Sequence, residues 1–182
     1  MLTEKEIIDG CKKGKPACQE ALYRLYGPRM KGICLRYAKT DFEAEDVFQD
    51  AFVSVFRNIE TFRDGSFSNW VRRIFVNAAI NNYRRNKKHY DHQDSSELEV
   101  NDDTSLSGLD ELSAREIMDL VNDLPEGYRL VFNLNIVEGY SHKEIGEMLE
   151  IAEATSRSQL ARAKAILKKK LETVNSCKYA SR

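Results

Sequence analysis

The chain has 182 residues, of which 42% are hydrophobic and 31% charged, and its formal net charge is −1. This length suits one medium domain or two small ones. The sequence contains no run of about 18 apolar residues, so we expect no insertion into a membrane. The first residues, Met1–Glu6, are polar and acidic and no apolar signal segment follows them, which predicts a cytoplasmic protein.

The first part of the chain carries signals for two helices. Thr3 and Glu6 have the spacing of a capping box before an apolar pair, which predicts a helix start. Pro16 suits the first turn of a second helix, whose apolar residues recur at helical spacing. We expect Gly27-Pro28 to end or kink this helix, because proline removes a backbone donor.

Two further helices are predicted between residues 41 and 88. Apolar residues recur every three or four positions over 44–59, and an acidic first turn precedes them, which indicates an amphipathic helix. A loop at 63–67 follows. The apolar residues of 70–79 then mark a helix that continues into the basic segment 83–88.

Charge is distributed unevenly along the chain. Residues 57–90 hold eight Lys or Arg against two acids, and residues 153–182 hold eight against two. Residues 91–111 hold eight acids and no Lys or Arg. Phosphate binding depends on local potential, so the two basic blocks matter more than the net charge. The polar segment 89–111 is predicted to be a flexible acidic linker between two helical domains.

The C-terminal part has the pattern of a helix-turn-helix, from about Leu124 to Leu171. Pro125 opens a helix that runs to Gly139, and Ser141 with Glu144 forms a second capping box. A break at 150–151 precedes a last helix at about 153–173. Because no segment shows the alternation of a β-strand, we predict an all-α fold.

The last helix has the side chains needed to read DNA. Leu160, Ala163, Leu167 and Leu171 lie on its inner side, whereas the outer side carries Thr155, Arg157, Ser158, Gln159 and Arg162. Arginine can bond guanine bidentately, glutamine can do so with adenine, and hydroxyls bond phosphate or base. On the residue pattern alone, a solvated basic helix packed on a bundle remains an alternative.

The polar residues do not indicate an enzyme, a metal site or a cofactor. Cys11, Cys18, Cys34 and Cys177 form no C-x-x-C pair, so we expect reduced and mostly buried thiols. The three histidines form no metal-binding motif. No glycine-rich phosphate loop or nucleophile elbow is present.

Residues 124–132 (LPEGYRLVF) and 137–146 (VEGYSHKEIG) resemble the fourth conserved region of bacterial sigma factors. Four positions depart from that pattern. Glu150 stands where a turn glycine is usual, Ala152 where a serine cap is usual, Ser156 where a buried valine is usual and Gln159 where an arginine is usual. Since a left-handed glutamate costs about 1 kcal/mol, Glu150 raises the expectation of a differently built turn.

The N-terminal part resembles the second conserved region of the same family. The similarity lies in residues 20–29 (EALYRLYGPR), 44–52 (AEDVFQDAF) and 62–77, and the domain that separates the two regions in larger sigma factors is missing. The chain therefore resembles the small, two-domain, extracytoplasmic-function (ECF) class. The resemblance implies domains at residues 1–88 and 112–174, a linker at 89–111 and a tail at 175–182.

The resemblance also implies roles for particular residues. Glu45, Asp46, Gln49 and Asp50 would hold the coiled-coil clamp helices of the RNA polymerase largest subunit, although an acidic helix face is often only solvated. Asn77 and Asn81 would lie near the pocket for a flipped minus-ten base, which the loop Arg63–Phe67 would cover. The basic side chains Arg72, Arg73, Arg84 and Arg85 would meet the DNA backbone. Trp70 and Phe75 lie on the apolar stripe, which favours core packing for both.

The resemblance implies a sigma factor that binds core RNA polymerase and promoter DNA, reads the minus-thirty-five element with its last helix and melts the minus-ten element with its N-terminal domain. An anti-sigma factor is a further partner common in the family. Two alternatives remain at this point: a stand-alone helix-turn-helix regulator, and a sigma-like regulatory protein without promoter reading.

Overall fold

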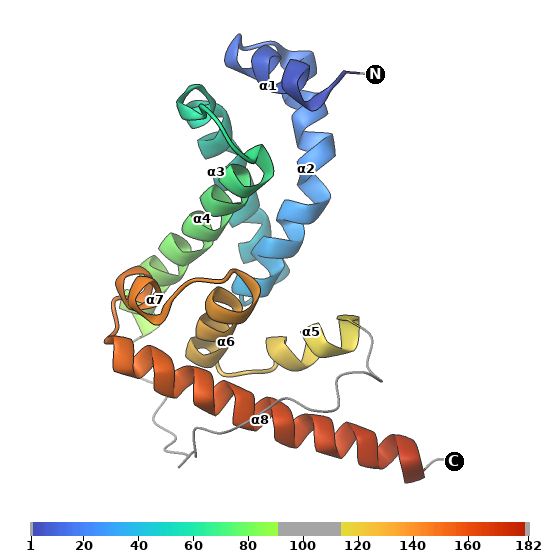
Figure 1. Cartoon of the computed structure of the whole chain (residues 1–182), viewed down its shortest axis with the longest axis vertical. Coiled ribbons are helices and arrows are strands. Elements are labelled where there is room, and N and C mark those ends of the chain that lie inside the picture. Colours follow the sequence, from blue (N-terminus) through green and yellow to red (C-terminus); the bar gives the residue numbers. More distant parts are fainter. Residues whose placement is uncertain (1, 91–113, 181–182) are drawn as a thin grey trace. The chain divides into compact units, whose positions relative to one another are not determined.

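The computed structural model describes residues 2–90 and 114–180, with side chains described over 2–86 and 116–173. All regular structure in these ranges is helical, which confirms the predicted all-α class. In chain order (Figure 1), the elements are α1 (Glu4–Lys12), α2 (Pro16–Tyr37), α3 (Asp41–Asn58), the short helix η1 (Ile59–Thr61), α4 (Phe67–Tyr90), α5 (Ala114–Asn122), α6 (Glu126–Phe132), the π-helical turn η2 (Asn133–Val137), α7 (His142–Leu149) and α8 (Glu153–Ala180).

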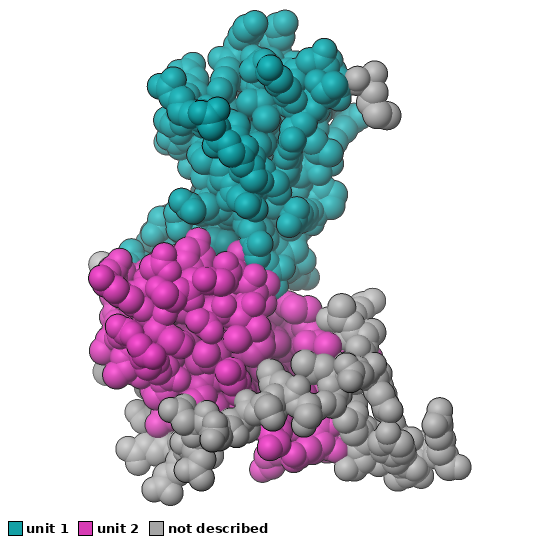
Figure 2. All heavy atoms as spheres, in the orientation of Figure 1, with its two compact units in different colours: residues 1–91 teal, residues 92–182 magenta. Residues whose placement is uncertain are grey.

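The chain divides into two compact units, residues 1–91 and 92–182 (Figure 2). This division agrees with the expectation of two helical bodies. The predicted acidic linker, residues 89–111, lies outside the described residues apart from its first two, which belong to α4. Among the described residues, no helix combines the length and apolar character that a membrane span requires.

The core of the first unit lies between α2, α3 and α4, which pack pairwise, while α1 packs on α2. Phe48 and Phe52 of α3 lie 5.8 and 5.1 Å from the ring of Phe75 on α4, measured between ring centroids. Phe75 is fully buried, as the apolar stripe predicted. The rings of Phe52 and Phe75 meet edge to face, which adds attraction to the burial of their area.

Helices α1, α2 and α3 begin where the sequence predicts, whereas α4 begins at Phe67, which the sequence analysis placed in the preceding loop. Thr3 accepts a hydrogen bond from the backbone of Glu6, whose carboxylate bonds back to Thr3, which confirms the first capping box. The hydroxyl of Thr40 accepts from the backbone N–H of Glu43 at 3.1 Å and caps α3. Each cap supplies an acceptor to a backbone N–H that has no partner within its helix.

Gly27-Pro28, which we expected to end or kink α2, does not end it, because the helix continues through Pro28 to Tyr37. Tyr26 and Gly27 before the proline and Met30 and Ile33 after it are all buried. Apolar packing on both sides of the proline thus offsets the backbone hydrogen bond that it removes.

The second unit is built on α8, against which α5, α6 and α7 pack. Its interior contains Leu130, Leu134, Ile145, Leu160 and Leu167, each less than a tenth exposed. The segment predicted as one helix to Gly139 divides into α6 and η2, where the N–H of Glu138 bonds the carbonyl of Asn133 at 2.9 Å. The last helix was predicted to end near residue 173 but continues to Ala180.

Candidate nucleic-acid interface

The turn between α7 and α8 keeps a left-handed residue. Glu150 has φ 57° and ψ 46°, so the glutamate adopts the conformation for which glycine is usual. The expectation of a differently built turn is therefore wrong. The turn is tight, because a Cβ added at Gly146 would lie 2.9 Å from the carbonyl oxygen of Ile151. This close approach fixes the path of the chain from the end of α7 to the start of α8. It requires the left-handed conformation at Glu150, which is strained for a residue other than glycine.

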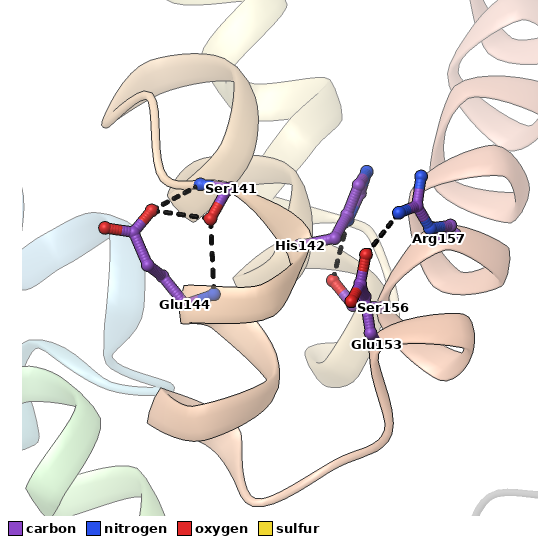
Figure 3. Close-up of polar contacts among 6 residues, drawn as sticks. All are labelled: Ser141, His142, Glu144, Glu153, Ser156 and Arg157. Atoms are coloured by element: carbon purple, nitrogen blue, oxygen red, sulfur yellow. Dashed lines mark hydrogen bonds and ion pairs between the residues drawn. The ribbon is translucent and has the colours of Figure 1, made fainter.

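The start of α7 is held by the second predicted capping box. The hydroxyl of Ser141 accepts from the backbone of Glu144 at 3.3 Å, and the backbone N–H of Ser141 donates to the Glu144 carboxylate at 2.8 Å (Figure 3). A fixed first turn of α7 orients the next residue, His142, toward α8.

His142 joins the two helices of the helix-turn-helix. Its Nδ1 lies 2.9 Å from the hydroxyl of Ser156 on α8, and the two atoms share a hydrogen bond (Figure 3). Ser156 has no exposed surface, whereas His142 is half-buried. The imidazole thus gives a polar partner to a hydroxyl where the family resemblance led us to expect valine. Burial, together with the nearby charge of Arg157, lowers the pKa of His142.

The first turns of α8 present three of the five predicted base-reading residues to solvent. Thr155, Arg157 and Ser158 are exposed. The guanidinium of Arg157 is paired with the Glu153 carboxylate one turn earlier (Figure 3). An exposed pair of this kind is weak, so DNA can compete for the arginine at little cost.

The other two predicted base-reading residues, Gln159 and Arg162, are half-buried against α6. A Cβ added at Gly127 would lie 3.4 Å from the Nε2 of Gln159, whose buried Oε1 finds no hydrogen-bond partner among the described residues. Arg162 donates to the hydroxyl of Tyr128 at 3.5 Å. Contact of these two side chains with DNA remains a prediction, and it requires them to reach past α6.

In the first unit, four of the predicted minus-ten residues form a stripe on α4. Arg73, Asn77, Asn81 and Arg85 follow one another every four residues, and all four are exposed. Residues at this spacing share one side of a helix. Arg72 and Arg84, which are predicted to contact the same DNA, are half-buried instead, and Arg63 is exposed in the loop before α4.

The aromatic residues around that loop pack on one another. Phe67 is buried, and its ring centroid lies 5.0 Å from that of Phe62 and 5.4 Å from that of Trp70. The core-packing interpretation therefore suits Phe67 as well as Phe75, whereas Trp70 is half-buried. This cluster joins Phe62, before the exposed loop, to Phe67 and Trp70, which follow it.

The predicted polymerase-binding residues lie together on the exposed side of α3. Glu45, Asp46, Gln49 and Asp50 are all exposed. Glu45 pairs with Lys31 of α2, and hydrogen bonds from Lys31 and then Gln49 hold the pKa of its carboxyl below the ordinary value. The face is acidic, as the sequence predicted.

The acidic face of α3 borders the stripe on α4. Arg85 lies 3.9 Å from the Asp50 carboxylate, across an open hollow of about 540 Å³ between the two helices. Glu43 joins α3 to α4, because its carboxylate accepts hydrogen bonds from the side chains of Asn82 and, at 2.9 Å, Asn86. Sequence reasoning did not find Glu43, because its partners lie about 40 residues along the chain.

These features define a class of helical DNA-binding protein. The chain is a two-unit helical protein in which one unit is a helix-turn-helix with an exposed polar and basic first turn on α8. The other unit carries a basic and amide stripe beside an acidic helix face. No group of His, Cys, Asp and Glu in the described part of the chain could hold a metal ion.

The comparisons place this class in a family. Residues 22–89 match the family Sigma-70 region 2, and residues 114–167 match Sigma-70, region 4. The ECF RNA polymerase sigma-E factor of Haemophilus influenzae is 27% identical over 183 residues, covering 94% of this chain and 96% of the relative. The ECF RNA polymerase sigma-E factor of Escherichia coli K12 is 26% identical over 183 residues, covering 94% and 95%.

Two solved structures share the fold. The sigma factor RpoE from Bartonella quintana, in complex with the anti-sigma factor NepR, matches with a TM-score of 0.50 and 20% identity over 85% of this chain and 96% of that one. CnrH, in complex with the cytosolic domain of CnrY, matches with a TM-score of 0.50 and 19% identity over 92% and 96%.

The chain belongs to the sigma-70 family and is an ECF sigma factor with regions 2 and 4, which directs transcription initiation. Sigma factors bind RNA polymerase and promoter DNA and are not enzymes, so the family confirms these predictions. It also decides against the stand-alone helix-turn-helix regulator, because residues 22–89 match region 2.

Proposed function

We propose that the second unit reads the minus-thirty-five element of the promoter as duplex DNA. The observation that carries this is the exposure of Thr155, Arg157 and Ser158 on the first turns of α8, the second helix of the helix-turn-helix. In such motifs the N-terminal residues of the second helix contact base edges in the major groove. Gln159 and Arg162 join this set where the DNA draws them away from α6.

In the first unit, the stripe of Arg73, Asn77, Asn81 and Arg85 binds the minus-ten element and helps to separate its strands. Separating two strands requires cations for the phosphates and a platform or pocket for an unstacked base. The stripe supplies both charge and amides, and Arg63 extends the charge into the exposed loop. Arg72 and Arg84 add positive potential from their half-buried positions.

The acidic face of α3 holds the clamp helices of the RNA polymerase largest subunit. Glu45, Asp46, Gln49 and Asp50 are exposed together, and the Lys31 pair keeps Glu45 ionised. Because Asp50 lies 3.9 Å from Arg85, the proposed polymerase-binding face is adjacent to the residues proposed to contact DNA. A sigma factor with these partners works in the cytoplasm, where core polymerase and DNA are found.

We further infer domains at residues 1–88 and 112–174, a linker at 89–111 and a tail at 175–182. One of the structurally similar sigma factors is bound to an anti-sigma factor. By analogy, we propose an anti-sigma factor as a partner of this chain as well.

Variants that separate the two roles of the first unit test these assignments. Replacing Asp46 and Asp50 together with Ala should weaken binding to core polymerase, measured by competition with a labelled sigma factor. Replacing Asn77 and Asn81 together with Ala should leave core binding intact but reduce permanganate reactivity of unpaired thymines at minus ten. If both double variants lose core binding equally, the division of the surface is wrong.

A further inference from the structure

The N-terminal helix α1 has no part in the roles assigned so far. The matched region 2 begins at residue 22, so α1 lies outside it. The helix is nevertheless firmly built: its capping box is complete, and Ile7 and Ile8 are buried against the rest of the unit. It packs on α2 and on η1, the short helix that leads into the exposed loop before α4.

Lys12, the last residue of α1, contacts the start of that loop. Its ammonium nitrogen donates to the carbonyl oxygen of Phe62 at 2.9 Å and lies 5.8 Å from the centroid of the Phe62 ring. The hydrogen bond is partly buried and joins residues 50 positions apart. A cation that bonds a carbonyl and faces a ring is held in two ways, by charge-assisted hydrogen bonding and by cation–π attraction.

Among the described residues, hydrogen bonds hold the loop at its two ends. Arg63, Asp64, Gly65 and Ser66 are all exposed, and Gly65 has a positive φ of 97°. At the far end, Ser66 accepts from the backbone N–H of Asn69 at 3.2 Å, which caps the first turn of α4. A hollow of about 340 Å³ separates the loop from α1, so the loop does not rest on that helix along its length.

We propose that Lys12 is a positioning residue for the Arg63–Ser66 loop and that α1 thereby belongs to the promoter-opening machinery. Lys12 fixes the Phe62 carbonyl and ring, and the Phe62 ring packs on Phe67 and Trp70. These contacts set the direction in which the backbone of the loop starts at Arg63. Lys12 does not itself touch DNA in this scheme, since its ammonium is engaged by the loop. The inference rests on the proposed minus-ten role of that loop.

The test uses the full chain assembled with core polymerase and measures initiation on a parent promoter, on promoters with single substitutions at minus ten, and on promoters with substitutions at minus thirty-five. Lys12→Met keeps the aliphatic stem but removes the donor and the charge. Lys12→Arg restores both. Lys13→Met is the matched control, because Lys13 is the adjacent, exposed lysine.

We expect Lys12→Met to lower initiation on the parent promoter about fivefold, the effect of losing roughly one net hydrogen bond. It should also reduce discrimination between the parent and the minus-ten variants while leaving discrimination at minus thirty-five unchanged. Lys12→Arg should restore the discrimination, and Lys13→Met should behave like the natural chain. If Lys12→Met does not assemble with core, Lys12→Leu, which also lacks the donor and the charge, replaces it with the same expectation.

Equal losses on every promoter would show that Lys12 only maintains the fold, and unchanged initiation would show that the contact has no role; either result overturns the proposal. A natural chain that ignores minus-ten substitutions would instead contradict the proposed function of the loop itself. The two failures are therefore distinguishable.

Discussion

The imidazole of His142 and the hydroxyl of Ser156 share a hydrogen bond of 2.9 Å that joins α7 to α8 inside the helix-turn-helix. The serine is fully buried, and a buried hydroxyl without a partner is costly, so each residue accounts for the presence of the other. Ser156 directly precedes Arg157, the exposed arginine of the proposed reading face. The geometry of that face therefore depends on a polar contact between two helices.

A double-mutant cycle should reveal this dependence. His142→Ala leaves the Ser156 hydroxyl enclosed without its partner and should destabilise the second unit by about 1–2 kcal/mol. Ser156→Val should cost less, because the half-exposed imidazole can bond water. The double variant should be more stable than the sum of the single effects by about 1 kcal/mol. Hydrogen exchange of buried amides in α7 and α8 measures these free energies.

Lys143→Ala provides the control for this cycle. Lys143 is the exposed neighbour of His142, and its replacement should change stability by less than about 0.5 kcal/mol. Strict additivity of the His142 and Ser156 variants would show that the hydrogen bond contributes nothing.

The second unit should become less stable as the pH is lowered, and His142 should cause part of this loss. The folded state lowers the pKa of this histidine below its ordinary 6.5 through burial and Arg157, with Lys164 adding to the effect and Glu153 opposing it. Below about pH 6.5 the unfolded chain therefore binds the proton more readily than the folded one, and stability decreases as pH falls from about 7 to 5.5. The same exchange measurement at several pH values should show a shallower dependence in His142→Asn. An identical slope in both proteins would contradict this origin.

Arg157 and Lys169 should affect DNA binding differently. Both are exposed on α8, but Arg157 lies in its first turns and Lys169 about three turns later. Arg157→Ala should weaken the free energy of DNA binding by about 1–3 kcal/mol at the parent minus-thirty-five sequence. The loss should be smaller where the contacted base is changed. Lys169→Ala should weaken binding slightly and evenly across sequences. Binding titrations with a set of substituted duplexes test this, and equal, sequence-independent losses would argue against base reading by Arg157.

Glu43 should stabilise the first unit, because it accepts from Asn82 and Asn86 of α4 and from the backbone of Lys39. Glu43→Gln removes the charge and replaces an acceptor with a donor, which should cost about 1–2 kcal/mol. Urea unfolding followed through Trp70, the single tryptophan of the chain, measures this. Glu60→Gln, at an exposed position on η1, is the control and should differ little from the natural protein.

Local rules predicted much of this fold. Both capping boxes, at Thr3 and Ser141, form as their three-residue spacing predicted, because a cap involves only neighbouring backbone. Helix ends were harder to predict. Pro28 lies inside α2 because packing on both sides of it outweighs a local rule, and α8 continues past residue 173, where no glycine or proline ends it.

The candidate site was less accessible to sequence reasoning, because its geometry comes from contacts between distant residues. Periodicity placed Gln159 and Arg162 on the outer side of α8, but α6 covers part of that side through Gly127 and Tyr128. No pattern within one helix links Lys12 to Phe62. Only the serine at position 156, polar where the family resemblance led us to expect an apolar residue, gave a signal that a partner such as His142 was needed.

This chain directs initiation, and we propose that it does so by reading two promoter elements. Run-off transcription with purified core RNA polymerase on a genomic promoter library tests it most directly. We expect the chain to bind core and to start transcription from a subset of templates that share one minus-thirty-five and one minus-ten sequence, while core alone does not select them. Absence of core binding and of selective initiation would contradict the account.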